Sequence, residues 1–295
     1  MKTKQLLLTL LLIPLLILSS CAYLTNNTIQ PDFNKETYPK VDGSTATIPL
    51  SENIAARLLS LNKEEVKSFI KHNSTNPAYD NLLNKTADII FVTEPSIDVL
   101  NMAEYKKIEL EVIPIVKEAF VFLVNKDNPV DELTVKEIQD IYQGKITNWK
   151  EVGGLDKEII AYQRPDNSGS QTLMQNLVMK DLKLMDAIKQ IKPSGMGHLV
   201  ERVASYDNSD RAIGYSVYYY ANTMYIKDSI KFIKVNGVEP NNETITSETY
   251  PFTSAYYAVL RKAEPENSSA RKLLQWILSD EGQQLAEQSG YVPLR

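Results

Sequence analysis

Short apolar runs alternate with amphipathic segments along most of the chain, and this alternation restricts the fold more than any other feature. Compact apolar runs at Ala87–Val92, Ala212–Val217 and Tyr256–Leu260 predict buried strands, whereas Glu52–Leu61 and Val135–Tyr142 have the spacing of amphipathic helices. Further predicted strands are Leu110–Val116, Ala119–Val124 and Ile159–Tyr162, and further predicted helices are Thr172–Met179, Leu199–Ala204, Ala270–Leu278 and Glu281–Gln288. Strands that alternate with helices indicate an α/β fold.

Two extended segments, each with a central proline, have the character of crossings between lobes. They are Val112–Val116 around Pro114 and Thr249–Tyr257 around Pro251. Two crossings imply that the middle of the chain forms a second lobe inserted into the first. Closure of two such lobes would bury a ligand between them.

The N-terminal 20 residues have the pattern of a secretory signal. Lys2 and Lys4 precede the apolar run Leu6–Leu18, which is too short for a comfortable membrane span, and Ser19-Ser20-Cys21 closes the segment. This end resembles the lipobox of bacterial lipoproteins, which implies cleavage before Cys21 and attachment of lipid, including palmitate, to that cysteine. Residues 21–40 are then expected to be a polar tether.

The composition excludes several classes of function. Removing residues 1–20 changes the net charge from −5 to −7, so the mature surface is acidic and argues against nucleic acid as a partner. With one cysteine there is no internal disulfide or thiolate cluster, and no His/Asp/Glu group has metal-ligand spacing. We therefore expect no metal and no cofactor, and any anion must be bound by a local arrangement of donors.

Such an arrangement is indicated at Arg164–Thr172, with the sequence Arg-Pro-Asp-Asn-Ser-Gly-Ser-Gln-Thr. A guanidinium precedes a hydroxyl- and glycine-rich turn that opens a helix, where unpaired N–H groups and the helix dipole favour an oxyanion. The alternative is a surface loop whose serines only cap the helix.

Five segments in order resemble the phosphate-binding group among the solute-binding proteins of bacterial ABC importers, which have the type II periplasmic-binding-protein fold. They are Asp42–Leu50, Pro129–Gly154, Arg164–Thr172, Asp210–Val217 and Ser279–Leu294. The resemblance implies two lobes with a ligand cleft, lobe I being residues 41–114 and 251–295 and lobe II residues 115–250. It also implies a monomer that is anchored outside the cell membrane, that captures an inorganic oxyanion, phosphate first, and that passes it to an ABC permease driven by a separate ATPase.

The same resemblance implies the residues that contact the ligand. The predicted contacts from lobe I are Ser44, Thr45, Thr47, Ser74 and Thr75, and those from lobe II are Arg164, Ser168, Gly169 and Ser170. For each hydroxyl the alternative is helix capping or a local turn.

The chain departs from the family pattern after the strand Ala87–Val92. Phosphate binders carry an aspartate there, which accepts a hydrogen bond from protonated phosphate and rejects sulfate. Here the aligned residue is Thr93, whose hydroxyl can donate or accept. Glu94 is a candidate for the missing carboxylate, as are Asp42 and Asp166, so the choice of anion stays open.

Two other classes of function are weighed against this interpretation. A phosphate-ester hydrolase is disfavoured because the chain lacks a Gly-x-Ser-x-Gly elbow and because His72 and His198 are expected to be surface or capping residues. The other is a surface sensor or adhesion protein without transport, for which the cluster Tyr218–Tyr220 would offer an aromatic surface. Packing explains that cluster more simply, and we expect no catalytic activity.

Overall fold

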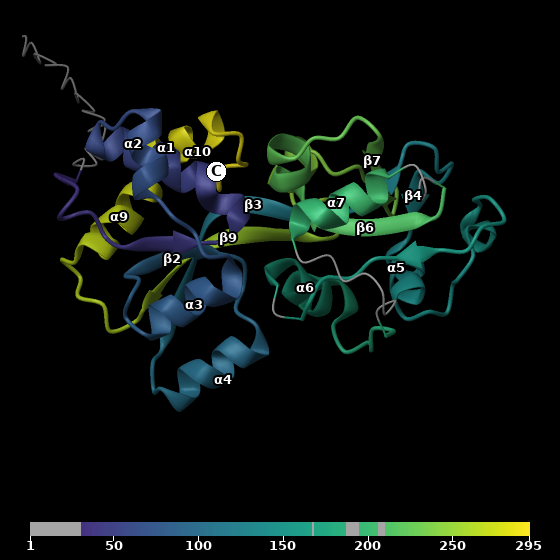
Figure 1. Cartoon of the computed structure of the whole chain (residues 1–295), viewed down its shortest axis with the longest axis horizontal. Helices are drawn as coiled ribbons and strands as arrows, with labels where there is room; N and C mark the ends of the chain where they lie inside the picture. Colours follow the sequence, from purple (N-terminus) through teal and green to yellow (C-terminus); the bar gives the residue numbers. More distant parts are fainter. Residues whose placement is uncertain (1–30, 167, 187–194, 206–209) are drawn as a thin grey trace, which may run out of the picture.

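The longest strand, β3 (Leu110–Asn125), runs through both lobes of the molecule (Figure 1). Its first part pairs antiparallel with β9 (Thr253–Arg261), and its second part pairs antiparallel with β6 (Ala212–Val217). The computed structural model describes residues 31–166, 168–186, 195–205 and 210–295. Because β3 belongs to both halves, one sheet connects the two lobes.

This sheet has seven strands in the order β1-β2-β9-β3-β6-β5, with β7 also paired to β3. The β1–β2 and β5–β6 pairs are parallel, and the other pairs in this sheet are antiparallel. The remaining bounds are β1 (Val41–Gly43), β2 (Ile89–Val92), β5 (Ile160–Ala161) and β7 (Ile230–Phe232), and a separate parallel pair consists of β4 (Glu132–Leu133) and β8 (Lys234–Val235). Strands mixed with helices confirm the predicted α/β class.

The prediction of two strands separated by Lys117 and Glu118 was wrong, because both residues continue β3 and pair with Ala255 and Ser254 of β9. Successive side chains of a strand point to opposite faces. Lys117 therefore reaches the surface, where its Nζ donates to the carbonyl of Thr246 at 2.7 Å, while Glu118 is buried. Both predicted crossing segments contribute to the β3–β9 pair.

Six helices accompany β1 and β2 in the first lobe: α1 (Ile48–Leu59), α2 (Lys63–Phe69), α3 (Thr75–Leu83), α4 (Ile97–Tyr105), α9 (Ser269–Ile277) and α10 (Asp280–Gln288). Helix α1 begins four residues before the predicted start because Pro49 lies in its first turn, where a missing N–H costs nothing. It ends at Ser60, which has a left-handed conformation.

The second lobe contains shorter helices around β6. They are α5 (Val135–Tyr142), α6 (Gly169–Leu173), α7 (Met196–Ala204) and α8 (Asn242–Thr246), with a 3-10 helix at Trp149–Val152 and π-helices at Met174–Met179 and Tyr220–Met224. Thr134 caps α5, as predicted, in a capping box with Glu137. The helix predicted to begin at Thr172 begins instead at Gly169, which brings its first turn into the cleft.

The packed body begins before Val41, within the segment predicted to be a tether. Tyr38 is buried, and its ring contacts the rings of Phe33 and Phe69 at centroid distances of 5.5 and 5.7 Å. The predicted signal segment and Cys21 lie outside the described residues. Among the residues that the structure describes, no helix is both long and apolar enough to cross a membrane.

Candidate functional site

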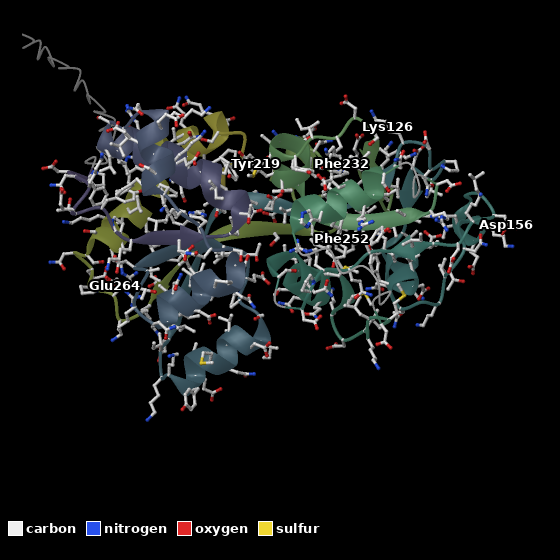
Figure 2. The ribbon with its side chains drawn as sticks, viewed as in Figure 1. Lys126, Asp156, Tyr219, Phe232, Phe252 and Glu264 are labelled. Carbon is white, nitrogen blue, oxygen red and sulfur yellow. The ribbon has the colours of Figure 1, made fainter. Side chains whose placement is uncertain are left out.

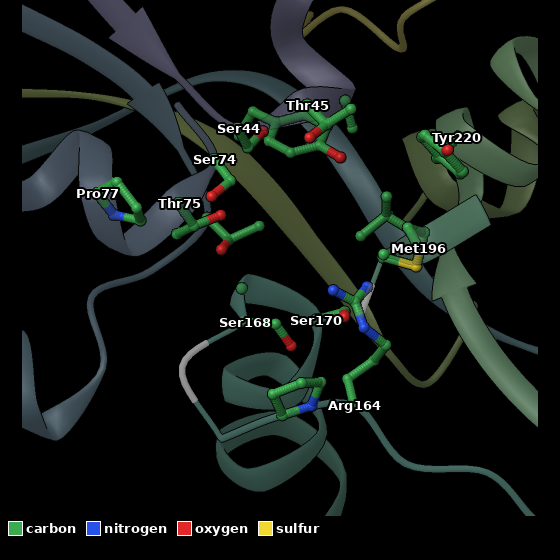
Figure 3. Close-up of a pocket in the computed structure, with 17 residues that line it drawn as sticks. Ser44, Thr45, Ser74, Thr75, Pro77, Arg164, Ser168, Ser170, Met196 and Tyr220 are labelled. Atoms are coloured by element: carbon green, nitrogen blue, oxygen red, sulfur yellow. The ribbon is translucent and has the colours of Figure 1, made fainter. Parts of the chain in front are cut away.

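A cavity of about 330 Å³ lies between the lobes (Figure 3). Nine of the eleven predicted ligand residues line it: Ser44, Thr45, Ser74, Thr75, Thr93, Arg164, Ser168, Gly169 and Ser170. The structure therefore brings together four separate segments of the chain. Thr47 and Glu94 are not among the lining residues.

The loop with Ser44 and Thr45 is held at the end of β1 by contacts to its backbone. The N–H of Ser44 donates to the carbonyl of Phe91 at 2.9 Å, which continues the β1–β2 pairing. Ser44 then precedes a 3-10 helix at Thr45–Thr47. Ser44 is buried and Thr45 is exposed, so the loop presents one hydroxyl from the cavity wall and one from its rim.

Thr47, predicted as a ligand contact, instead holds this loop from behind. Its hydroxyl donates to the carbonyl of Phe91 at 2.8 Å or to that of Ser44 at 3.0 Å, and its side chain is fully buried. Thr47 is not among the residues that line the cavity. Its role is structural.

His72 is a positioning residue that the sequence interpretation missed. Its Nδ1 lies 2.9 Å from the carbonyl oxygen of Ser44 and 3.3 Å from the hydroxyl of Thr47. Burial lowers the pKa of His72, which favours the neutral ring with its proton on Nδ1 donated to Ser44. The prediction of a surface or capping histidine was wrong, because a polar sequence context says nothing of which loop will cover the ring.

The loop with Ser74 and Thr75 is held by Asp42. The carboxylate of Asp42 accepts from the N–H and the side-chain amide of Asn73, both at 2.8 Å, and from Asn81 at 2.7 Å. Asp42 is therefore occupied by its own lobe and is not free to replace the missing aspartate. Ser74 has φ of 74° and ψ of 170°, a region that costs a non-glycine residue about 1–3 kcal/mol and that occurs often at functional sites.

Thr93 lies at the end of β2 and turns its side chain to the cavity. The hydroxyl of Tyr79 donates to the carbonyl of Thr93 at 2.8 Å, which fixes the backbone. The Oγ1 of Thr93 is buried and has no hydrogen-bond partner among the described residues. Glu94 instead accepts from the hydroxyl of Tyr257 at 3.2 Å, so its carboxylate is directed away from the cavity lining.

Arg164 supplies the charged group from the second lobe. Its backbone N–H donates to the hydroxyl of Tyr215 at 2.8 Å and to Oε1 of Gln171 at 3.1 Å, and Tyr215 also donates to Gln171. Figure 3 shows the guanidinium reaching into the cavity. Burial lowers the pKa of Arg164, but an arginine stays charged in proteins.

The first turn of α6 supplies short donors beside Arg164. Ser168 is the N-cap, and its Oγ accepts from the N–H of Gln171 at 3.3 Å. The Oγ of Ser170 is buried without a partner, and the N–H groups of Gly169 and Ser170 have none among the described residues. Buried polar groups normally find partners, so these are available to a ligand.

At Gly169 the second lobe approaches Thr75 and Thr93 of the first lobe closely. A Cβ at this position would lie 2.4 Å from Oγ1 of Thr75 and 2.7 Å from Oγ1 of Thr93. Those distances are shorter than any ordinary contact. A residue without a side chain therefore allows α6 to meet the first lobe.

The far side of the cavity is apolar and aromatic. Met196 and Tyr220 lie across the cavity from Ser74 and Thr75 (Figure 3), and Ala46, Val217 and Tyr256 also contribute to the lining. Tyr218, Tyr219 and Tyr220 are all buried, which confirms that this cluster packs, although Tyr220 also faces the cavity. No described residue of the lining carries a carboxylate, so one guanidinium, several hydroxyls and a helix N-terminus define a site for a small oxyanion.

Comparisons with known proteins agree with this geometry. A family model described as "PBP superfamily domain" matches residues 35–281. The phosphate-binding protein PstS of Borreliella burgdorferi is 23% identical over 267 residues, covering 89% of this chain and 92% of that protein. The protein of the same name from Staphylococcus saprophyticus is 27% identical over 265 residues, covering 86% of this chain and 80% of that protein.

Solved structures show the same architecture. A putative phosphate ABC transporter substrate-binding protein from Clostridium perfringens, solved with bound phosphate, superposes with a TM-score of 0.68 at 26% identity and covers 88% of this chain and 100% of that chain. An ABC-type phosphate transport receptor from Vibrio cholerae superposes with a TM-score of 0.65 at 20% identity, covering 86% of this chain and 99% of that chain.

Proposed function

The chain belongs to the PBP superfamily, and we propose that it is an extracytoplasmic solute-binding protein that captures inorganic phosphate for an ABC importer. The observation that carries this proposal is the interlobe cavity, where Arg164, the first turn of α6 and the hydroxyls of the first lobe converge, with no carboxylate among the lining residues that the structure describes. The names of the relatives support phosphate as the ligand. The proposal assigns no catalytic step to this chain.

The mechanism follows from the donors on each side of the cleft. Ser44, Thr45, Ser74 and Thr75 would hold the anion from the first lobe, and Arg164 with Ser168–Ser170 would hold it from the second. Each charge-assisted hydrogen bond contributes about 1.5–3 kcal/mol net. Because neither lobe offers all the donors, the ligand stabilises the closed arrangement of lobes I and II, which a permease with its own ATPase would recognise.

A competition titration tests the choice of anion. We expect the mature protein to bind phosphate more tightly than sulfate, because Oγ1 of Thr93 can accept a hydrogen bond from the P–OH of phosphate, a group that sulfate lacks. Thr93→Asp should widen that preference by about 10- to 100-fold, since a carboxylate facing sulfate leaves two acceptors unpaired at a cost of about 1–3 kcal/mol. Calorimetry with phosphate, sulfate, molybdate and an organic phosphate measures the preference.

Glu94→Gln is the matched control for that titration, because Glu94 follows Thr93 but does not line the cavity. It should leave the ratio of phosphate to sulfate affinity unchanged. Equal displacement by phosphate and sulfate in the wild type would contradict the assignment of phosphate. A lower ratio in Glu94→Gln would mean that this carboxylate reaches the ligand after all.

The proposal places the mature chain, as a monomer, outside the cell membrane with a lipid on Cys21. We expect radiolabelled palmitate to be incorporated into the wild type and not into Cys21→Ser, because Cys21 is the only cysteine in the chain. Membrane fractionation should then place the wild type with the membrane and the variant in the soluble fraction. Label that is still incorporated into Cys21→Ser would contradict the attachment of lipid at Cys21.

A further inference from the structure

A buried carboxylate lies on β3 where the two lobes meet. Glu118 is 2% exposed and pairs with Ser254 in the β3–β9 ladder, so Tyr256 is its diagonal neighbour on the same face. Oε1 of Glu118 accepts from the N–H of Ala119 at 2.8 Å and from that of Tyr219 at 3.2 Å. Tyr219 follows β6 and lies at the junction of the lobes in Figure 2.

Glu118 has no positive partner in the described part of the chain. It forms no ion pair there, and its Oε2 has no hydrogen-bond partner. The titratable groups that face it are the phenols of Tyr218, Tyr219, Tyr256 and Tyr291. Lys117, the preceding residue, points to the other face of the strand and pairs with Glu248 at 3.0 Å.

Burial raises the pKa of Glu118 to about 7, against the opposing effect of hydrogen bonds from backbone N–H groups. A group with that pKa is partly ionised at neutral pH. A small change in its electrical environment therefore changes the number of protons it holds.

Two chains of contacts connect Glu118 to the cavity. Tyr256, its diagonal neighbour, lines the cavity directly. The ring of Tyr219 stacks on Tyr291 with centroids 3.6 Å apart, and the hydroxyl of Tyr291 donates to the carbonyl of Ala46 at 2.7 Å. Ala46 lines the cavity directly after Thr45. A bound anion and an ionised Glu118 are thus like charges in a poorly hydrated region, where their repulsion is strong.

We propose that Glu118 couples anion capture to proton uptake: an anion that enters the cavity draws a proton from solvent onto Glu118, and ionisation of Glu118 weakens anion binding. The inference rests on the proposed function only in requiring that the cavity binds an anion. Since linkage is reciprocal, an anion that raises the pKa of Glu118 must itself bind more tightly when Glu118 is protonated. Affinity is therefore highest on the acid side of neutrality and falls as the pH rises.

Glu118→Gln separates this effect from the titration of phosphate itself. Glutamine keeps an oxygen acceptor for the N–H groups of Ala119 and Tyr219 but cannot ionise. Calorimetry with inorganic phosphate near pH 7, in two buffers of different ionisation enthalpy, should show that the wild type takes up more protons than Glu118→Gln. From about pH 5.5 to about pH 8.5, phosphate affinity of the wild type should fall about tenfold relative to the variant, for each unit by which phosphate raises the pKa of Glu118.

A second measurement needs no variant. The carboxyl carbon of Glu118, assigned by NMR in the labelled protein, should titrate at a higher pH with phosphate than without it.

Glu248→Gln is the matched control for Glu118→Gln in the calorimetry, because it removes an exposed carboxylate beside β3. It should keep the proton uptake and the pH profile of the wild type.

Equal proton uptake and parallel pH profiles in the wild type and Glu118→Gln would overturn the coupling while leaving phosphate binding in place. A titration of Glu118 that does not move when phosphate is added would do the same. Absence of phosphate binding by both proteins would contradict the proposed function itself, and with it the coupling.

Discussion

Arg164→Ala should abolish tight phosphate binding and leave the fold intact. Among the described residues that line the cavity, Arg164 is the only charged one, and its guanidinium can make two charge-assisted hydrogen bonds to an oxyanion. At about 1.5–3 kcal/mol for each bond, the loss corresponds to a dissociation constant about 10²- to 10⁴-fold higher. Isothermal titration calorimetry with phosphate measures it directly.

The fold should survive because the hydrogen bonds from the backbone N–H of Arg164 to Tyr215 and Gln171 do not need the side chain. Circular dichroism and the thermal midpoint check this point. Arg164→Lys is the matched variant that keeps the charge. It should recover only part of the affinity, since an ammonium cannot reproduce the planar fork. A dissociation constant of Arg164→Ala near that of the wild type would place the anion elsewhere.

Much of the site could be predicted from the sequence because its parts are local. A guanidinium, a Ser-Gly-Ser turn and a helix start lie within nine residues at Arg164–Thr172, and two Ser/Thr turns precede helices in the first lobe. Such turns place hydroxyls and N–H groups at helix N-termini whatever the rest of the fold. The residues of these three turns line one cavity in the structure. Their contact with a ligand stays a prediction.

The remaining features depend on contacts between distant segments. Whether Thr45 or Thr47 faces the cavity depends on a single 3-10 turn, which a pattern of adjacent threonines does not specify. Tyr256 lines the cavity because β9 pairs with β3. In that register Tyr256 lies opposite Val116, which is 140 positions earlier in the chain. The loop of Ser44 partly covers His72, and tyrosines from three other segments bury Glu118.

The prediction of β3, the strand that contains Glu118, was wrong for a similar reason. Two adjacent charged residues predict a break between strands, because charges are rarely buried. The structure instead continues β3 through them, with Lys117 at the surface and Glu118 inside. A sequence pattern that looks like a boundary was here a buried titratable group at the junction of the lobes.

Gly169→Ala should weaken phosphate binding by about 100-fold while the protein stays folded. The added methyl group would lie 2.4 Å from Oγ1 of Thr75 and 2.7 Å from Oγ1 of Thr93, and both threonines are buried. Overpacking of this kind costs about 1–3 kcal/mol. The cost falls on the closed arrangement, in which α6 meets the first lobe, so the N–H groups of Gly169 and Ser170 cannot reach an anion held by the other lobe. Calorimetry and small-angle X-ray scattering with and without phosphate measure affinity and closure.

The thermal midpoint of the ligand-free protein distinguishes a steric block to lobe closure from destabilisation of α6. Alanine in the first turn of a helix is more favourable than glycine, so Gly169→Ala should not lower the thermal midpoint of the ligand-free protein. Gly195→Ala adds the same methyl group beside the cavity, where its nearest neighbour among the described residues is His198 at 3.8 Å, and it should lose far less affinity. If Gly169→Ala binds and closes on phosphate as the wild type does, the two lobes do not need to meet at this point, and capture would rest on Arg164 and the hydroxyls alone.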